Sequence, residues 1–374
     1  MPLKHSGFTF ALMTAADWTF FREQLLNWYQ PERRPMPWKE HKDVYHIWLS
    51  EIILQQTRVE QGRAYYDRFS AAYPAVQDLA RAPDDEVMKL WEGLGYYSRA
   101  RNLLKAARKV VDELKGEFPR TDKELLALPG VGPYTAAAIA SFAYGEQIPV
   151  VDGNVYRILA RYAGSAVAID STLGKQHFAE IAELALGEAP AARYNQAIMD
   201  FGALVCTPRR ASCNRCPLAE RCVALATDQV YELPIKEKKT KRRDRYFHYL
   251  VVQDDSGRTI IHRRGEGDIW QGLYEFPLCE AAGAEVRTEE LSTLPDWPDW
   301  LPAKELVFER RSPPTKQQLS HQTIFAVFHT FRWSLMPGQL PGQRITQTNL
   351  LDNFAFPRVI AKFNADKDLL LDLF

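Results

Sequence analysis

Apolar residues between positions 17 and 225 recur mostly at intervals of three and four, which is the spacing of one helix face. Residues 18–29 carry Phe21, Leu25 and Leu26 on such a face, and Val44 opens a second long periodic stretch after the break at 35–37. Further helices are predicted at 85–92, 99–114, 123–128, 134–144, 154–162 and 177–186. The first part of the chain is therefore predicted to be all helical.

The pattern changes after residue 245. Alternating apolar and polar positions predict strands at 246–253 and 258–262, joined by a turn at 254–257, and a further strand at 323–333. Residues 356–374 return to a helical pattern. We therefore predict a multidomain protein with an all-α domain over 1–225, a basic linker over 226–245 and a smaller α+β domain over 246–374.

Composition narrows the class of protein. The 374 residues are 46% hydrophobic and 25% charged, which is typical of a globular protein, and no apolar run reaches the ~20 residues that cross a bilayer. The formal net charge is zero, but seven Lys and Arg residues lie between 236 and 245. That run is either a solvated linker or a flexible strap that contacts nucleic-acid phosphates. The weak N-terminal signal and the clustered cysteines predict an intracellular protein.

Four of the five cysteines follow the pattern Cys206-x6-Cys213-x2-Cys216-x5-Cys222. Thiolates at this spacing can close on one metal centre and select zinc or iron–sulfur. Structural zinc sites usually show two close cysteine pairs, and this motif has only one, so the wider gaps favour a 4Fe-4S cluster. Four unrelated buried cysteines are the remaining alternative.

A second motif, LPGVGPYTAAA, covers residues 128–138. A helix ends, Gly130 and Gly132 make a tight turn, and a helix of small residues begins. Glycines allow close backbone approach, and the N–H groups at the start of the next helix suit a phosphate. This is the helix–hairpin–helix pattern of DNA-binding proteins, with a plain structural turn as the alternative.

Two carboxylates lie where opposite pKa shifts are expected. The spacing of Ile47, Trp48 and Glu51 places Glu51 on the apolar stripe of its helix, where desolvation should raise its pKa and let it hold a proton. Asp152 precedes a predicted helix start, where amide donors and the helix dipole should favour its ionised form. This division suits an acid and an anionic stabiliser. A paired structural Glu51 and a plain N-cap Asp152 are the alternatives.

The hairpin and the cysteine motif, in this order, resemble the endonuclease III superfamily of base-excision DNA glycosylases. Within it, WLSEIILQQT at 48–57, GLGYYSRARNL at 93–103 and VDGNV at 151–155 resemble the MutY-type adenine DNA glycosylases. The resemblance runs from about residue 20 to the chain end. It implies excision of adenine mispaired with 8-oxoguanine in double-stranded DNA, by a monomer. The rivals are a glycosylase for thymine or uracil, and a non-catalytic iron–sulfur protein that binds lesions.

The resemblance also assigns catalytic roles. Glu51 would protonate N7 of a flipped-out adenine, and Asp152 would stabilise the oxocarbenium ion, supported by Tyr134 and Asn154. Lyases of the superfamily carry a lysine where Tyr134 stands. The absence of that lysine predicts a monofunctional glycosylase that uses water and leaves an abasic site.

Other residues are implied to bind the DNA or the lesion. They are Arg34, Gln56, Thr57, Tyr96, Gly130, Gly132, Leu319, Ser320 and His321. Gln56 and Tyr96 would wedge into the duplex around 8-oxoguanine with Thr57 beside that base, whereas Tyr96 and Tyr97 packed in the core is the alternative. Lys39 stands where the family commonly has arginine, which keeps the charge but not the bidentate geometry.

The second domain resembles the Nudix-like domain of the same family through GDIWQGLYEFP at 267–277. Residues 287–290 do not fit the metal-binding run of an active Nudix hydrolase, so this domain is expected to bind 8-oxoguanine without hydrolysing a nucleotide. Ser320 can hydrogen-bond the modified base, but Leu319 replaces a family phenylalanine and removes a stacking surface. The last residues, 370–374, resemble a sliding-clamp-binding peptide; a terminal helix packed on its own domain is the alternative.

Overall fold

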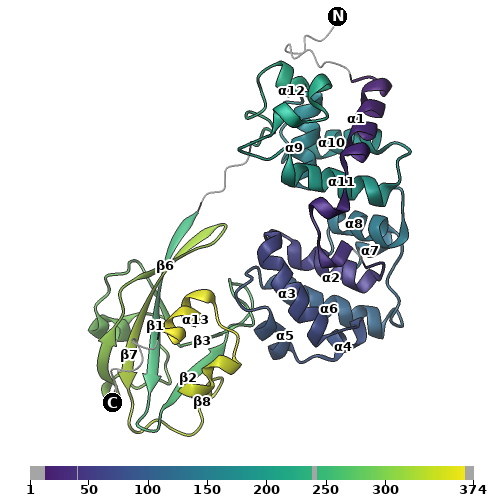
Figure 1. Cartoon of the computed structure of the whole chain (residues 1–374). Coiled ribbons are helices and arrows are strands. Elements are labelled where there is room, and N and C mark those ends of the chain that lie inside the picture. The colour runs from purple at the N-terminus through teal and green to yellow at the C-terminus, as the bar shows by residue number, and fades with distance from the viewer. Residues whose placement is uncertain (1–12, 40, 238–241, 367–374) are drawn as a thin grey trace, which may run out of the picture. The chain divides into compact units, whose positions relative to one another are not determined.

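The computed structural model describes residues 13–39, 41–237 and 242–366 (Figure 1). The chain forms two compact units, one of Met1–Ala80 with Lys105–Lys239 and one of Arg81–Leu104 with Thr240–Phe374. The described residues include no helix that is both long and apolar enough to cross a membrane.

Helices make up the first unit. They are α1 (Ala15–Trp28), α2 (Val44–Leu54), α3 (Val59–Ala72), α4 (Val76–Arg81), α7 (Asp122–Leu125), α8 (Pro133–Tyr144), α9 (Gly153–Ala163), α10 (Thr172–Leu186), α11 (Ala191–Leu204) and α12 (Val223–Ala226), with short 3-10 turns η1 (Pro31–Arg33), η2 (Pro37–Lys39), η3 (Cys213–Arg215) and η4 (Ala219–Arg221). α6 (Ser98–Asp112) begins in the second unit and ends in the first. The all-helical prediction for this part of the chain is confirmed.

The sequence missed four of these helices, α3, α4, α11 and the short α12. The periodic stretch from Val44 is two helices and not one, because Gln56 adopts a left-handed backbone conformation (φ 55°) that ends α2. In α11 the apolar stripe is interrupted by Asn195 and Asp200, which are buried polar residues with hydrogen-bond partners in distant segments of the chain. Burial of polar residues removes the contrast between faces that periodicity detects.

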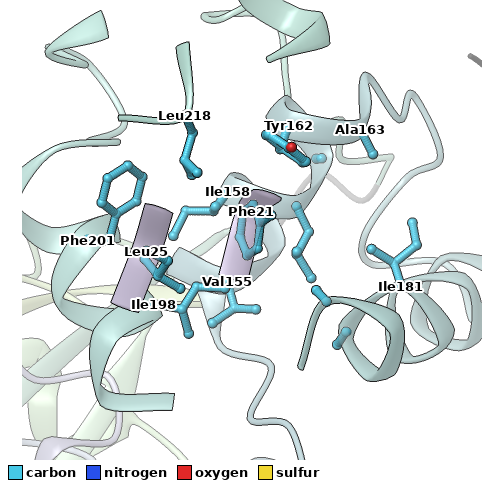
Figure 2. Close-up of a cluster of buried hydrophobic side chains, with 14 of the residues drawn as sticks. Phe21, Leu25, Val155, Ile158, Tyr162, Ala163, Ile181, Ile198, Phe201 and Leu218 are labelled. Carbon is cyan, nitrogen blue, oxygen red and sulfur yellow. The ribbon is translucent and has the colours of Figure 1, made fainter. Parts of the chain in front are cut away.

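A hydrophobic core joins the beginning and the end of this unit. Figure 2 shows Phe21 and Leu25 of α1 beside Ile158 of α9 and Ile198 and Phe201 of α11, and all five are buried. Removing each such side chain from water stabilises the fold by about 2 kcal/mol. The core therefore fixes α9 and α11 against each other. This packing sets the positions of the start of α9 and of the outer face of α11, meaning the face that points away from this core.

The second unit is built on a mixed sheet. Its strands are β1 (Arg243–Gln253), β2 (Arg258–Arg263), β3 (Tyr274–Glu275), β4 (Leu278–Ala281), β5 (Val307–Arg311), β6 (Thr315–Gln318), β7 (Gln322–Arg332) and β8 (Arg344–Gln347). The central path is β3-β2-β1-β7-β5, in which β1 and β7 run parallel and the other pairs are antiparallel. The unit also has α5 (Asp84–Leu90), α13 (Arg358–Ala365) and the 3-10 turns η5 (Thr288–Thr293), η6 (Ala303–Glu305) and η7 (Thr348–Asn353). The predicted α+β class is confirmed.

Residues 81–104 pack with this second unit, although the sequence placed them in the helical domain. Lys89 Nζ donates to the carbonyl of Phe354 (3.1 Å), and the amide of Phe356 donates to the carboxylate of Glu92 (2.8 Å). Helical periodicity shows which face of a helix is buried, but it does not show which part of the chain covers that face.

The predicted basic linker is shorter than 226–245. Leu233 is buried in the core of the first unit, where its carbonyl accepts from Arg161 Nε (3.1 Å). Arg245 lies inside β1, buried, and pairs with Asp268 (2.7 Å) and Glu280 (2.6 Å), so it is neither a solvated linker residue nor a contact for nucleic acid. The predicted C-terminal helix is α13, and the proposed clamp-binding residues 370–374 lie outside the described residues.

Candidate active site

A cavity of about 910 Å³ opens in the helical unit between the end of α2, the hairpin, the start of α9 and the outer face of α11. Its lining brings together most of the residues singled out from the sequence. They are Arg34, Glu51, Gln56, Thr57, Gly130, Gly132, Tyr134, Asp152 and Asn154. Segments separated by more than 100 residues in the chain therefore form one site.

Glu51 lies on α2 and is only 8% exposed. Its pKa is raised to about 7, mainly by burial and to a smaller extent by the nearby charge of Asp152, while a hydrogen bond with the Tyr134 hydroxyl opposes both effects. The Tyr134 hydroxyl oxygen also lies 3.5 Å from Met199 Sδ, which places it between α2 and α11. The raised pKa predicted for Glu51 is confirmed, and this carboxyl can hold a proton near neutral pH.

Asp152 is the N-cap of α9. One carboxylate oxygen accepts from the backbone N–H groups of Asn154 and Val155 (2.8 Å each), and the other accepts from Asn154 Nδ2 (2.8 Å). The predicted amide donors are therefore present, but the predicted direction of the pKa shift is wrong. Burial raises the pKa of Asp152, and the three hydrogen bonds only oppose that effect. The environments of Glu51 and Asp152 differ in this set of N–H donors, which stabilises the ionised form of Asp152.

Arg157 supports this end of α9 and was missed by the sequence reasoning. Its Nη2 donates to Asn154 Oδ1 (2.9 Å) and to the carbonyl of Gly202 (2.8 Å), and its Nε donates to the carbonyl of Cys206 (2.8 Å). One buried guanidinium thus holds Asn154, the end of α11 and the start of the cysteine loop. Arginine in a helical pattern is usually on the exposed face, so the sequence carried no signal for this role.

Gln196 on α11 is a second residue that the sequence did not indicate. It lines the cavity, and its side-chain carbonyl is buried without a hydrogen-bond partner among the described residues. A buried acceptor in this state is unfavourable unless a ligand supplies an N–H or O–H donor. The cavity is therefore suited to a molecule with such a donor.

The predicted hairpin is formed by α7, the turn at 129–132 and α8. Gly130 has φ 79°, which only glycine adopts without strain, and Gly132 caps α8 with Pro133 in the first helical turn. Gln55 Nε2 donates to Thr135 Oγ1 (3.0 Å) and to the Gly130 carbonyl (3.3 Å). The hairpin is thereby tied to the end of the helix that carries Glu51.

The remaining predicted lesion-binding residues lie in the second unit. Tyr96 has φ 47°, is 45% exposed and forms a hydrogen bond with Ser320 Oγ through its hydroxyl (2.8 Å). Tyr97 is buried, so the core alternative holds for Tyr97 and is wrong for Tyr96. Leu319 and Ser320 are partly exposed between β6 and β7, and His321 is exposed.

The four cysteines of the motif line one small cavity of about 30 Å³. Arg161 Nη1 donates to Cys206 Sγ (3.4 Å), and Cys222 Sγ donates to the Arg161 carbonyl (3.6 Å). Among the described residues, no three or more His, Cys, Asp or Glu side chains are grouped as ligands of a single metal ion. Four cysteines lining one cavity, beside the positively charged Arg161, have the donor chemistry of a site that holds a cluster through four thiolates.

Comparison with known proteins shows which families the two parts of the chain resemble. Residues 49–182 match the HhH-GPD superfamily of base excision DNA repair proteins, and residues 248–365 match the NUDIX domain. A solved thermostable thymine-DNA glycosylase superposes with a TM-score of 0.53 at 30% identity, covering 57% of this chain and 98% of that one. The fold and the site thus define a helix–hairpin–helix protein of base excision repair.

Two relatives narrow the family. An adenine DNA glycosylase of Buchnera aphidicola subsp. Schizaphis graminum is 36% identical over 312 residues, covering 83% of this chain and 84% of the relative. One of Mus musculus is 46% identical over 341 residues, covering 77% and 66%. This chain belongs to the adenine DNA glycosylase family, which confirms the resemblance found in its motifs. Proteins of this family are generally iron–sulfur proteins.

Proposed function

We propose that this protein is a monofunctional glycosylase that removes adenine opposite 8-oxoguanine in duplex DNA. The observation that carries the proposal is the convergence of Glu51, Tyr134 and Asp152 on one cavity, with a proton-holding carboxyl and an N–H-stabilised carboxylate on its walls. Cleavage of an N-glycosidic bond needs both groups, one for the leaving base and one for the sugar cation.

The reaction follows from those two groups. Glu51 donates its proton to N7 of adenine, the C1′–N9 bond breaks, and both bond electrons leave with the base. Asp152 stabilises the positive charge that develops on the sugar. Water then adds at C1′ and gives a proton to the Glu51 carboxylate, which leaves an abasic site and restores the acid. Tyr134 stands where a lyase would carry an amine, so no Schiff base forms.

Gln196 supports adenine as the base that is bound. Its unpartnered carbonyl can accept a hydrogen bond from an exocyclic amino group. Adenine has such a group at N6. Since a base inside a duplex cannot reach a buried carboxyl, the nucleotide must be flipped into the cavity.

Recognition of the DNA is assigned to the hairpin and to the lesion-reading residues. Backbone N–H groups after Gly132 can bind a phosphate at the start of α8. Gln56 and Tyr96, which would wedge into the duplex, both have left-handed backbone conformations outside the regular elements. Ser320 reads the 8-oxoguanine edge, and Leu319 supplies an aliphatic contact in place of a ring.

A 4Fe-4S cluster is the cofactor that Cys206, Cys213, Cys216 and Cys222 would hold, and it would organise the loop between α11 and α12. We further propose that the protein acts as a monomer on DNA inside the cell, and that residues 370–374 serve as a clamp-binding peptide. Deleting residues 371–374 should then abolish pull-down by the sliding clamp without affecting glycosylase activity.

The test uses duplexes labelled on the strand that carries the target base. Adenine opposite 8-oxoguanine, adenine opposite guanine and thymine opposite guanine are incubated with wild type and with Glu51→Gln, with and without alkali. We expect cleavage of the adenine strand only after alkali, and its loss in the variant. Strand breaks without alkali would indicate a lyase, release of thymine would indicate another glycosylase, and tight binding without excision would indicate a non-catalytic reader.

A further inference from the structure

Asp200 on α11 is a buried carboxylate with two cationic partners. Its side chain is 2% exposed, Arg34 Nη1 lies 3.0 Å from one oxygen, and Lys39 Nζ lies 2.5 Å from the other. Both partners come from the short segment of η1 and η2, more than 160 positions earlier in the chain. A carboxylate taken out of water is tolerated only when such partners replace its hydration.

The two partners differ in where they lie. Lys39 is nearly buried, and its Nζ also donates to the backbone carbonyl of Arg34 (3.2 Å). Arg34 is a quarter exposed and lines the cavity with Glu51 and Tyr134. Its positive charge lowers the pKa of the Tyr134 hydroxyl, against the larger effect of burial, which shows that the guanidinium is close to the reacting groups. Asp200 thus holds the side chain of Arg34, and Lys39 holds its backbone.

The charges of this group are not balanced. One carboxylate faces two cations, so the cluster keeps a net positive charge at the wall of the cavity. Asp200 engages one nitrogen of Arg34, and a guanidinium has five N–H donors in a rigid fork. The ring nitrogens of a flipped purine are acceptors that such a fork can contact.

We propose that Asp200 is a positioning residue for Arg34: the buried ion pair, with Lys39 beside it, fixes the guanidinium at the cavity wall so that it contacts the flipped base without reorganising. The inference rests on the proposed function, because it concerns the binding of the excised base. It also explains how a lysine at position 39 can contribute to the site. A lysine ammonium lacks the fork geometry that would bind both carboxylate oxygens of Asp200, so one oxygen remains to accept from Arg34.

A double-mutant cycle separates positioning from a merely structural role. Asp200→Asn keeps the shape and removes the charge, and Arg34→Met keeps the stem and removes the guanidinium. The single-turnover rate of adenine release is measured at saturating enzyme for wild type, both single variants and the double variant. We expect about a tenfold loss for each single variant, and a double variant within about twofold of Arg34→Met.

Asp254→Asn is the matched control, because Asp254 is also a buried carboxylate paired with an arginine, Arg258 (2.6 Å), but lies in the other unit. It should leave the single-turnover rate at the wild-type value. If circular dichroism shows that Asp200→Asn does not fold, Lys39→Met replaces it in the cycle, with the same non-additivity expected.

Losses that multiply in the double variant would show that Asp200 does not act through Arg34 and would overturn the inference while leaving the proposed function intact. If wild type releases no adenine, the proposed function and this inference both fall. The two failures are therefore distinguishable in one set of reactions.

Discussion

Replacing Glu51 by glutamine should stabilise the protein, and by more at high pH than at low pH. Burial raises the pKa of this carboxyl from 4.5 to about 7 in the folded state. A carboxyl whose folded pKa lies above its unfolded pKa favours folding only while it is protonated. Its contribution is therefore lost as the pH rises from about 4.5 to about 7. Above that range the folded protein must hold a buried anion that the unfolded chain leaves in water.

The size of the effect follows from the same values. At about 1.36 kcal/mol per pH unit, the interval corresponds to about 3 kcal/mol when Glu51 is fully ionised. Near pH 5 only about 1 kcal/mol of this has been lost, because the folded carboxyl is still protonated. Glutamine carries no charge at either pH. The stability gained by Glu51→Gln should therefore grow by about 2 kcal/mol between about pH 5 and about pH 8.5.

Urea denaturation followed by far-UV circular dichroism measures this difference, because most helices lie in the unit that holds Glu51. Glu113→Gln, the same substitution at an exposed position in the same unit, is the control, and its effect on stability is subtracted at each pH. Packing changes caused by the amide are equal at both pH values and cancel. A gain that stays constant for Glu51→Gln would refute the conclusion that burial controls the protonation of Glu51.

Three further outcomes are expected. The single-turnover excision rate of wild type should fall about tenfold per pH unit above about pH 7, since only protonated Glu51 can donate; a rate that is flat to about pH 9 would contradict this role. Cys213→Ser should reduce bound iron from about four atoms per chain and bleach the visible absorbance, measured by metal analysis and spectroscopy; full retention of iron would exclude this cysteine as a ligand. Arg264→Leu should destabilise the second unit by about 3 kcal/mol in thermal or chemical unfolding, because it leaves the buried Glu275 without the guanidinium 2.5 Å away; a loss under about 1 kcal/mol would show that this network contributes little.

Local spacing was sufficient to predict those parts of the site that lie within a short stretch of the sequence. The cysteine motif, the hairpin glycines and the apolar stripe around Glu51 are each contained within 17 residues or fewer. Their chemistry depends on neighbours in the chain, so the helix start at Val44, the helix at 134–144 and the raised pKa of Glu51 could be predicted. The two-domain class followed in the same way, from a change of period near residue 245.

The burial of polar residues could not be predicted from local spacing. The sequence predicted a lowered pKa for Asp152 because its cap donors are local, but the pKa is raised because remote segments exclude water from it. Arg157 and Asp200 look like surface residues of their helices, yet both are buried through contacts with segments far along the chain. Nothing in a helical period distinguishes a polar residue that faces water from one that faces a partner.

The sequence by itself therefore determined the helical and strand-rich parts, the four thiols, the hairpin and the identity of the two carboxyls, because these depend on residue type and short-range spacing. Only the tertiary structure decided that Glu51, Tyr134 and Asp152 share a cavity, that Gln196 offers it an unpartnered acceptor, and that Arg34 is held there by Asp200. The physical reason is that desolvation and ion pairing depend on which distant segments meet. That is fixed by the packing of the core and not by any local pattern.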